Sequence, residues 1–184
     1  DLGMSFSAAA ENEMTQGHGH PITGRLLALG HAPSLGADLE SVLSGDMLTQ
    51  ARVALGMQRS LDNVAHREQH GSIPTTSTVR TRQALEWVTV EGARMLGQLD
   101  RIGTLAEGKQ ADLVLIRASD LNMQPVHDPV STVVMQTSLA NIDSVMVAGQ
   151  WKKRHGQLLG VDLAPQLEML RASGRKITQA LGLH

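Results

Sequence analysis

The spacing of apolar residues changes near Gly103, and this change divides the chain into two parts of different type. Before Gly103, strands and helices are predicted in alternation: strands at 3–10 and 32–36, and helices at 23–29, from Ser44 onward and at 78–96. Alternation of this kind is typical of βα units built on a parallel sheet. The first part is therefore predicted to be α/β.

Two helices in this first part have a clear apolar face. The first follows the start signal Ser44-Gly-Asp46, and its apolar positions at helical spacing are Met47, Ala51, Ala54 and Leu55. The second is predicted to run from 78 to 96, with one face made of Leu85, Val88, Gly92 and Met95. The polar segment from 66 to 78 is predicted to be the loop between them.

After Gly103 the pattern indicates short strands. Runs rich in β-branched residues and broken by turn residues occur at 112–116, 132–135 and 144–147. Ala148-Gly149-Gln150 is typical of a hairpin turn that returns the chain through Trp151. A final helix is predicted from Pro165 to Leu181, because Pro165 suits a first helical turn and apolar residues recur on one face.

Composition excludes several classes of function. Lys and Arg total 16 against 18 for Asp and Glu, a net charge of −2, whereas a nucleic-acid binder usually shows a basic excess. No apolar run approaches the roughly 20 residues that a membrane-spanning helix needs. The chain has no cysteine, so a reducing, cytoplasmic location is expected and any metal would be held by His, Asp or Glu.

Asp38 is the first candidate functional residue. It follows the strand predicted at 32–36, and in parallel α/β folds the carboxyl ends of the strands carry the active site. A carboxylate there can bind a metal ion and accept a proton from activated water. The alternative is an ordinary turn aspartate that hydrogen-bonds to the nearby backbone.

The segment Gly17-His18-Gly19-His20 is the second candidate. It is not a phosphate loop, since it lacks both the Walker pattern and the dinucleotide-binding spacing. His18 and His20 could share a metal ion, but loop histidines are more often surface or hydrogen-bonding residues. Acidic side chains around these loops either line a pocket or are solvated; they are Glu11, Glu13, Glu40 and Asp46.

Two long stretches carry a family resemblance. Residues 84–97 read ALEWVTVEGARMLG, and residues 102–116 read IGTLAEGKQADLVLI. Shorter matches follow at 128–130 (DPV) and 143–150 (DSVMVAGQ). With these motifs the whole chain resembles the C-terminal portion of the amidohydrolase superfamily, in its cytosine-deaminase-like and chlorohydrolase-like branch.

The resemblance implies a fold. Members form a (β/α)8 barrel flanked by a small β-sandwich that is built from both ends of the chain. We therefore expect an incomplete barrel, with its last βα units at 1–102, a small β-sandwich portion at 103–160 and a C-terminal helix at 161–184. A whole barrel takes about 250 residues, so the chain is expected to be a C-terminal fragment of a longer enzyme.

The resemblance also implies roles for individual residues. Asp38 matches the aspartate after the last barrel strand, which binds the metal and carries a proton from the activated water to the leaving group. His18 lies in the loop after the seventh strand, which holds no standard ligand, so the other ligands are expected before Asp1. Glu11, Glu13 and His18 become candidates for the substrate pocket. The sequence departs from the family at Ala37, where Thr or Val is usual, and at 9–11, where Ala-Ala-Glu replaces Ser-Pro-Glu.

The resemblance thus predicts a metal-dependent hydrolase of non-peptide carbon–nitrogen bonds. It would deaminate or dechlorinate a small heterocycle with water activated by a divalent metal, zinc first and iron second. The expected assembly is a homo-oligomer, without nucleic-acid or membrane partners, and the isolated chain is expected to be inactive. Two alternatives stay open: a non-catalytic β-rich structural or interaction module, and a ring-opening hydrolase of the dihydroorotase or hydantoinase type.

Overall fold

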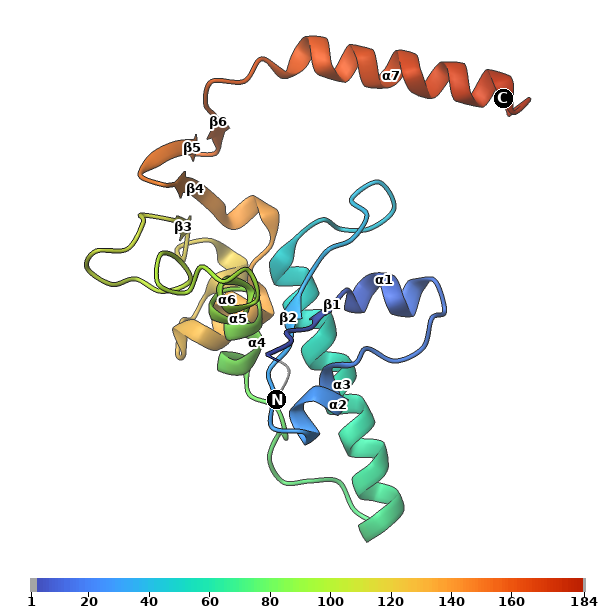
Figure 1. The fold of residues 1–184 in the computed structure, drawn as a ribbon, viewed down its shortest axis with the longest axis vertical. Coiled ribbons are helices and arrows are strands. Elements are labelled where there is room, and N and C mark those ends of the chain that lie inside the picture. The colour runs from blue at the N-terminus through green and yellow to red at the C-terminus, as the bar shows by residue number, and fades with distance from the viewer. Residues whose placement is uncertain (1–2, 184) are drawn as a thin grey trace.

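A computed structural model describes residues 3–183. The first part of the chain is mainly helical, with elements β1 (Ser7–Ala8), α1 (Ala10–Thr15), α2 (Thr23–Ala28), β2 (Ser34–Leu35), α3 (Met47–His70), α4 (Thr81–Trp87) and α5 (Val90–Met95). The second part contains β3 (Leu113–Ile116), η1 (Leu121–Met123), α6 (Pro129–Gln136), η2 (Leu139–Asn141), β4 (Ile142–Val147), β5 (Gln150–Arg154), β6 (Gln157–Leu158) and α7 (Leu163–Ala180). Figure 1 shows the two parts meeting where α4 and α6 lie together.

The strands β1 and β2 form a parallel pair, as the alternation of strands and helices predicted. The Ser34 N–H donates to Phe6 O at 2.9 Å, and the Gly36 N–H donates to Ala8 O at 3.0 Å. The strand predicted at 3–10 is much shorter, because α1 begins at Ala10. A carboxylate oxygen of Glu13 accepts a hydrogen bond from the Ala9 N–H at 2.9 Å, which favours a helix start here.

Helix α3 lies at the centre of the core. Asp46 caps its first turn by accepting a hydrogen bond from the Leu48 N–H at 3.0 Å, which confirms the predicted start. The predicted face is buried at Ala51, Ala54 and Leu55. The predicted end near 66 is wrong: the helix continues to His70 and ends at Gly71, whose φ of 68° is the left-handed value of a C-terminal cap.

The buried core joins this helix to the elements around it. Leu35 of β2, Trp87 of α4 and Val134 of α6 all pack with the α3 face. The Arg52 guanidinium also links α3 to the end of α6, because it donates to Val134 O at 3.0 Å and to Thr137 O at 2.6 Å. Burial of apolar surface, at about 25 cal/mol per Å², is the main source of stability for such a cluster.

The single helix predicted at 78–96 is two helices. The break falls at Val88 and Thr89, where the Thr89 hydroxyl donates to Leu85 O at 2.8 Å and the backbone leaves helical geometry. A threonine side chain that bonds to the backbone of the preceding turn competes with the helix ladder. The continuous apolar face predicted for this segment is therefore divided between α4 and α5.

The strand predicted at 132–135 is wrong, because these residues belong to α6. Asp128 caps the helix by accepting from the Ser131 N–H at 3.0 Å, and Pro129 occupies the first helical position. Thr132 and Val134 are buried against the core. The capping residues and this burial outweigh the strand preference of the β-branched residues.

The second part contains an antiparallel sheet in the order β3-β4-β5-β6. The predicted hairpin is confirmed: Val147 pairs with Gln150, and Ala148 and Gly149 both have positive φ, at 49° and 79°. Two positive φ values suit the twist of a two-residue hairpin loop.

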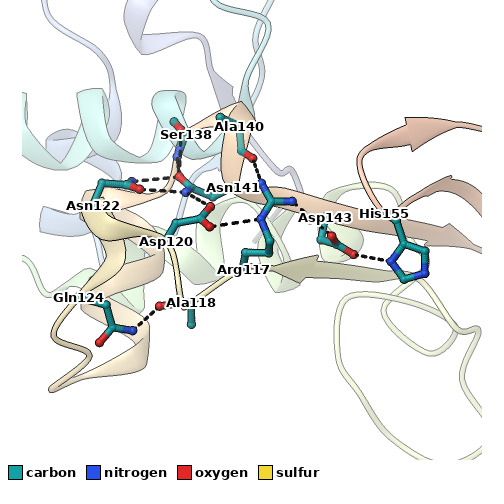
Figure 2. A network of polar contacts seen from close by, with 10 residues as sticks. All are labelled: Arg117, Ala118, Asp120, Asn122, Gln124, Ser138, Ala140, Asn141, Asp143 and His155. Carbon is teal, nitrogen blue, oxygen red and sulfur yellow. Dashed lines mark hydrogen bonds and ion pairs between the residues drawn. The ribbon is translucent and has the colours of Figure 1, made fainter.

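A polar network connects the end of β3 to the start of β4 (Figure 2). The Arg117 guanidinium donates to Asp120 Oδ1 at 3.3 Å, to Asp143 Oδ1 at 3.2 Å and to Ala140 O at 2.6 Å. The Asn141 amide donates to Asp120 Oδ2 at 2.8 Å, and this bond, together with Arg117, lowers the pKa of the Asp120 carboxyl. The network fixes the sheet against η1 and η2.

Helix α7 stands apart from the other elements (Figure 1). It covers Leu163–Ala180, close to the predicted 165–181, and none of its residues is buried.

Among residues 3–183, no helix is both long and apolar enough to span a membrane.

Candidate active-site edge

The carboxyl ends of β1 and β2 bring two chain segments together. Helix α1 starts two residues after β1, and Asp38 lies three residues after β2. Because the strands are parallel, both segments lie at the same edge of the sheet. The structure therefore places Asp38 where the sequence predicted it, at the end of a parallel strand.

Asp38 is exposed and has an unusual backbone. Its φ is 59°, in the left-handed region that Asp and Asn adopt more readily than other residues with a side chain. Backbone outliers of this kind cluster at functional sites, where neighbouring structure maintains them.

Asn12 is the partner of Asp38. Its amide Nδ2 donates a hydrogen bond to Asp38 Oδ2, and its own Oδ1 accepts from Gln16 Nε2 at 2.6 Å. The Asn12 side chain is buried, with 5% of the residue exposed. Asn12 was not among the residues predicted from the sequence, because its position beside Asp38 depends on strand pairing and not on any local motif.

Glu11 contacts α3 and the segment before it. Its Oε2 accepts from the Ser44 hydroxyl and from Gln50 Nε2, both at 2.6 Å. Its backbone N–H donates to Gln50 Oε1 at 3.3 Å. These bonds give the Glu11 side chain a defined structural task, the attachment of α1 to α3.

Glu13 and His18 are the other two predicted pocket residues. The Glu13 side chain bonds to the Ala9 N–H at the start of α1. His18 is exposed, and its backbone N–H donates to Glu13 O at 2.8 Å. In the described residues, Asp38 accepts its side-chain hydrogen bond from Asn12, and none joins it to Glu11, Glu13 or His18. The role of these three residues in a substrate pocket stays a prediction.

The donor set at this edge fits a metal ion only in part. Within residues 3–183, no group of three or more His, Cys, Asp and Glu side chains is placed to hold a metal. Asp38 has Oδ1 available, since the bond from Asn12 occupies Oδ2 and none reaches Oδ1 in the described part of the chain. Zinc in proteins takes about four ligands, of which Asp38 can supply one.

A cavity lies at the opposite ends of the strands. It has a volume of about 580 Å³, and residues just before β1 and β2 line it together with α5, among them Phe6, His31, Glu91 and Arg94. Glu91 and Arg94 form an ion pair at 2.9 Å within this lining. Asp38 is not among the lining residues, so this cavity is separate from the edge that carries Asp38.

Comparison with known proteins identifies relatives of this chain. Residues 9–152 match the model of the amidohydrolase family. The chain is 33% identical over 174 residues to an 8-oxoguanine deaminase of Pseudomonas aeruginosa, an alignment that covers 94% of this chain and 36% of the relative.

Solved structures also match most of this chain. An adenosine deaminase of Xanthomonas campestris with bound zinc matches with a TM-score of 0.84 and 26% identity, over 95% of this chain and 38% of that one. An atrazine chlorohydrolase of Arthrobacter aurescens complexed with zinc matches with a TM-score of 0.78 and 23% identity, over 94% of this chain and 36% of that one. The chain thus spans little more than a third of the length of each protein it matches here. It shares the fold of the corresponding third.

Proposed function

The chain belongs to the amidohydrolase family, and from this premise we propose that it contributes the terminal aspartate of a metal-dependent deaminase. The proposed enzyme hydrolyses a non-peptide carbon–nitrogen bond of a small heterocycle. The chain supplies the last βα units of an incomplete barrel, and the remaining metal ligands come from sequence outside it. The observation that carries the proposal is the position of Asp38, beyond the carboxyl end of the second of two parallel strands.

Asp38 has two roles in this proposal. Its free Oδ1 would hold the divalent metal, for which zinc is preferred over iron because both solved structures named above contain zinc. Such a metal would supply the Lewis acidity that makes water a nucleophile near neutral pH. The Asp38 carboxylate accepts the proton from the attacking water and passes it to the leaving nitrogen.

The proposed reaction is a hydrolytic deamination. A carbon–oxygen bond forms between water and the ring carbon, the carbon–nitrogen bond breaks, and the amino group leaves as ammonia. The substrate is proposed to be an aminated purine or a similar heterocycle, because the sequence relative that covers most of this chain is named an 8-oxoguanine deaminase. The named adenosine deaminase structure points to the same substrate class.

Dechlorination is the second candidate function. The chlorohydrolase match supports it only at the level of the fold, since the identity is 23%. In that reaction a carbon–oxygen bond would form, the carbon–chlorine bond would break, chloride would leave, and the proton of the water would pass through Asp38 to the solvent.

The test uses the longest natural polypeptide that contains this chain, purified and loaded with zinc or iron. Release of ammonia is measured with 8-oxoguanine, guanine and adenosine, and release of chloride with a chlorinated triazine. Asp38→Asn tolerates the left-handed backbone and retains hydrogen-bonding atoms but loses the charge, so it is expected to lower kcat at least 1,000-fold, about 4 kcal/mol. Asp100→Asn, at an exposed loop position, is the matched control and is expected to behave as the parent.

Two outcomes would contradict the proposal. One is an Asp38→Asn variant with parental turnover. The other is a polypeptide that binds metal but releases neither ammonia nor chloride. A separate assay of the isolated 184-residue chain addresses its expected inactivity, and clear metal-dependent turnover by that chain would disprove it.

A further inference from the structure

We propose that Asn12 is a positioning residue for Asp38, which fixes the direction of its carboxylate and reserves Oδ1 for the metal. The inference rests on the proposed function of Asp38. It adds a residue that lies on a different βα unit and that no sequence motif points to.

The hydrogen bonds fix which way the Asn12 amide faces. Gln16 Nε2 donates a hydrogen bond to Asn12 Oδ1 at 2.6 Å, so the amide oxygen already has a partner. Nδ2 is left to donate to Asp38 Oδ2. Because the Asp38 carboxylate can only accept hydrogen bonds, a flip of the Asn12 amide would place its oxygen against another acceptor, so the observed direction is the stable one.

The burial of Asn12 makes the contact persistent. The residue is 5% exposed, so its amide has little access to water that could replace the Asp38 carboxylate as a partner. A buried polar group without a partner costs free energy, and this cost favours the arrangement in which the bond to Asp38 is made. Asp38 itself is exposed, so its direction depends on this partner.

The residues on each side of Asn12 fix helix α1. Glu11 bonds to Gln50 of α3 through both its carboxylate and its backbone N–H. Glu13 bonds to the Ala9 N–H at the start of the helix. Asn12 thus projects from a short helix whose start is capped by Glu13 and which Glu11 attaches to α3, and this limits how far its amide can move.

The two carboxylate oxygens of Asp38 differ in their hydrogen bonding. Oδ2 accepts the bond from Asn12, and Oδ1 accepts none within the described residues. A ligating carboxylate whose second oxygen is held by a hydrogen bond is the usual way in which outer residues orient a metal ligand. Asn12 would therefore act on metal affinity and on kcat through Asp38, without touching substrate.

The experiment uses the longest natural polypeptide that contains the chain, with its metal. Asn12→Leu removes the amide at similar volume and is expected to weaken metal affinity or lower kcat by about 10- to 100-fold, the usual effect of losing such a partner. KM is expected to stay within about twofold, since Asn12 does not contact substrate. Metal affinity is measured by competition with a chelator, and kcat and KM are measured separately on the folded protein.

Asn141→Leu is the matched control. Asn141 is also buried, at 2% exposed, and also holds an aspartate through its amide, but it lies in the network around Arg117. Its replacement is expected to lower stability without changing metal affinity or kcat. If Asn12→Leu does not fold, Asn12→Ser replaces it: its hydroxyl is too short to reach Asp38, so the same loss is expected.

A reversed pair tests whether the contact itself is real. Asn12→Asp places two carboxylates together and is expected to destabilise the fold, whereas the double variant Asn12→Asp/Asp38→Asn restores a donor facing an acceptor. The double variant is expected to regain stability but not activity. A folded Asn12→Leu protein with parental kcat and metal affinity overturns the positioning role, while an active Asp38→Asn protein overturns the proposed function instead.

Discussion

Glu11 and Gln50 exchange two hydrogen bonds between helices α1 and α3. Gln50 Nε2 donates to the Glu11 carboxylate at 2.6 Å, and the Glu11 N–H donates to Gln50 Oε1 at 3.3 Å. Gln50 is completely buried, so its amide depends on Glu11. The sequence placed Glu11 at a substrate pocket, and the structure gives its side chain a task in holding the helix that carries Asn12.

Replacement of Glu11 is expected to cost stability. Glu11→Ala leaves the buried Gln50 amide without its partner and should lower the free energy of unfolding by about 1–3 kcal/mol. Glu11→Gln keeps an acceptor oxygen and should lose less. Urea denaturation of the purified protein measures both, with Glu68→Ala on the exposed part of α3 as the control, expected within about 0.5 kcal/mol of the parent. Equal stability of Glu11→Ala and the parent would contradict the role.

The network around Arg117 is expected to make the fold sensitive to acid. The pKa of the Asp120 carboxyl is lowered from 3.8, first by the hydrogen bond from Asn141 and then by Arg117. A carboxyl with a lowered pKa in the folded state stabilises the fold above about pH 4, and this stabilisation is lost as the pH falls through the folded-state value.

Asp120→Asn tests this expectation. The variant should be less stable than the parent at pH 7, and the difference should shrink as the pH falls below about 4 and the parent carboxyl becomes protonated. The measurement is the free energy of unfolding in urea across this range. A difference that stays constant with pH would show that the charge of Asp120 does not contribute.

Gly103 lies at a position that excludes a side chain. Its φ is 88°, and a Cβ built there would lie 2.6 Å from the Ala93 Cβ. Gly103→Ala is therefore expected to destabilise the fold by roughly 1–3 kcal/mol. The control is Gly56→Ala in the middle of α3, where a Cβ meets nothing within 4 Å and stabilisation of about 0.4–1 kcal/mol is expected. Thermal denaturation of both variants should show shifts of opposite sign.

The two tryptophans report on different parts of the fold. Trp87 is 1% exposed in the helical core, whereas Trp151 is partly exposed in the sheet near the Arg154 guanidinium. Trp151→Phe should leave emission that is shifted to shorter wavelength and poorly quenched by iodide, and Trp87→Phe should leave the reverse. Strong iodide quenching of the Trp151→Phe protein would contradict the buried position of Trp87.

Local signals in the sequence predicted the elements that are stabilised by interactions between residues close together in the chain. Asp46 marked the start of α3, and the turn at Ala148 and Gly149 marked the hairpin between β4 and β5. The α6 segment was predicted wrongly because its β-branched residues favour a strand on propensity, whereas burial of Val134 and the Asp128 cap decide for a helix.

The candidate site likewise has one feature that the sequence predicted and one that it did not. The position of Asp38 after a strand was predictable, since it depends on the order of elements along the chain. The contact from Asn12 was not predictable, because it requires β1 and β2 to pair in one register and so bring together two residues that are 26 positions apart in the sequence. Hydrogen bonds between distant side chains follow from the packed structure and leave no periodic trace in the sequence.

The left-handed backbone at Asp38 restricts how this position can be engineered. Glutamate offers the same carboxylate on a longer stem, but a left-handed φ of 59° is tolerated mainly by Asp, Asn and Gly. Of these three, only Asp carries a charge. The local backbone thus narrows the choice of an anionic side chain here to one amino acid, and a design that seeks glutamate must first remodel the turn after β2.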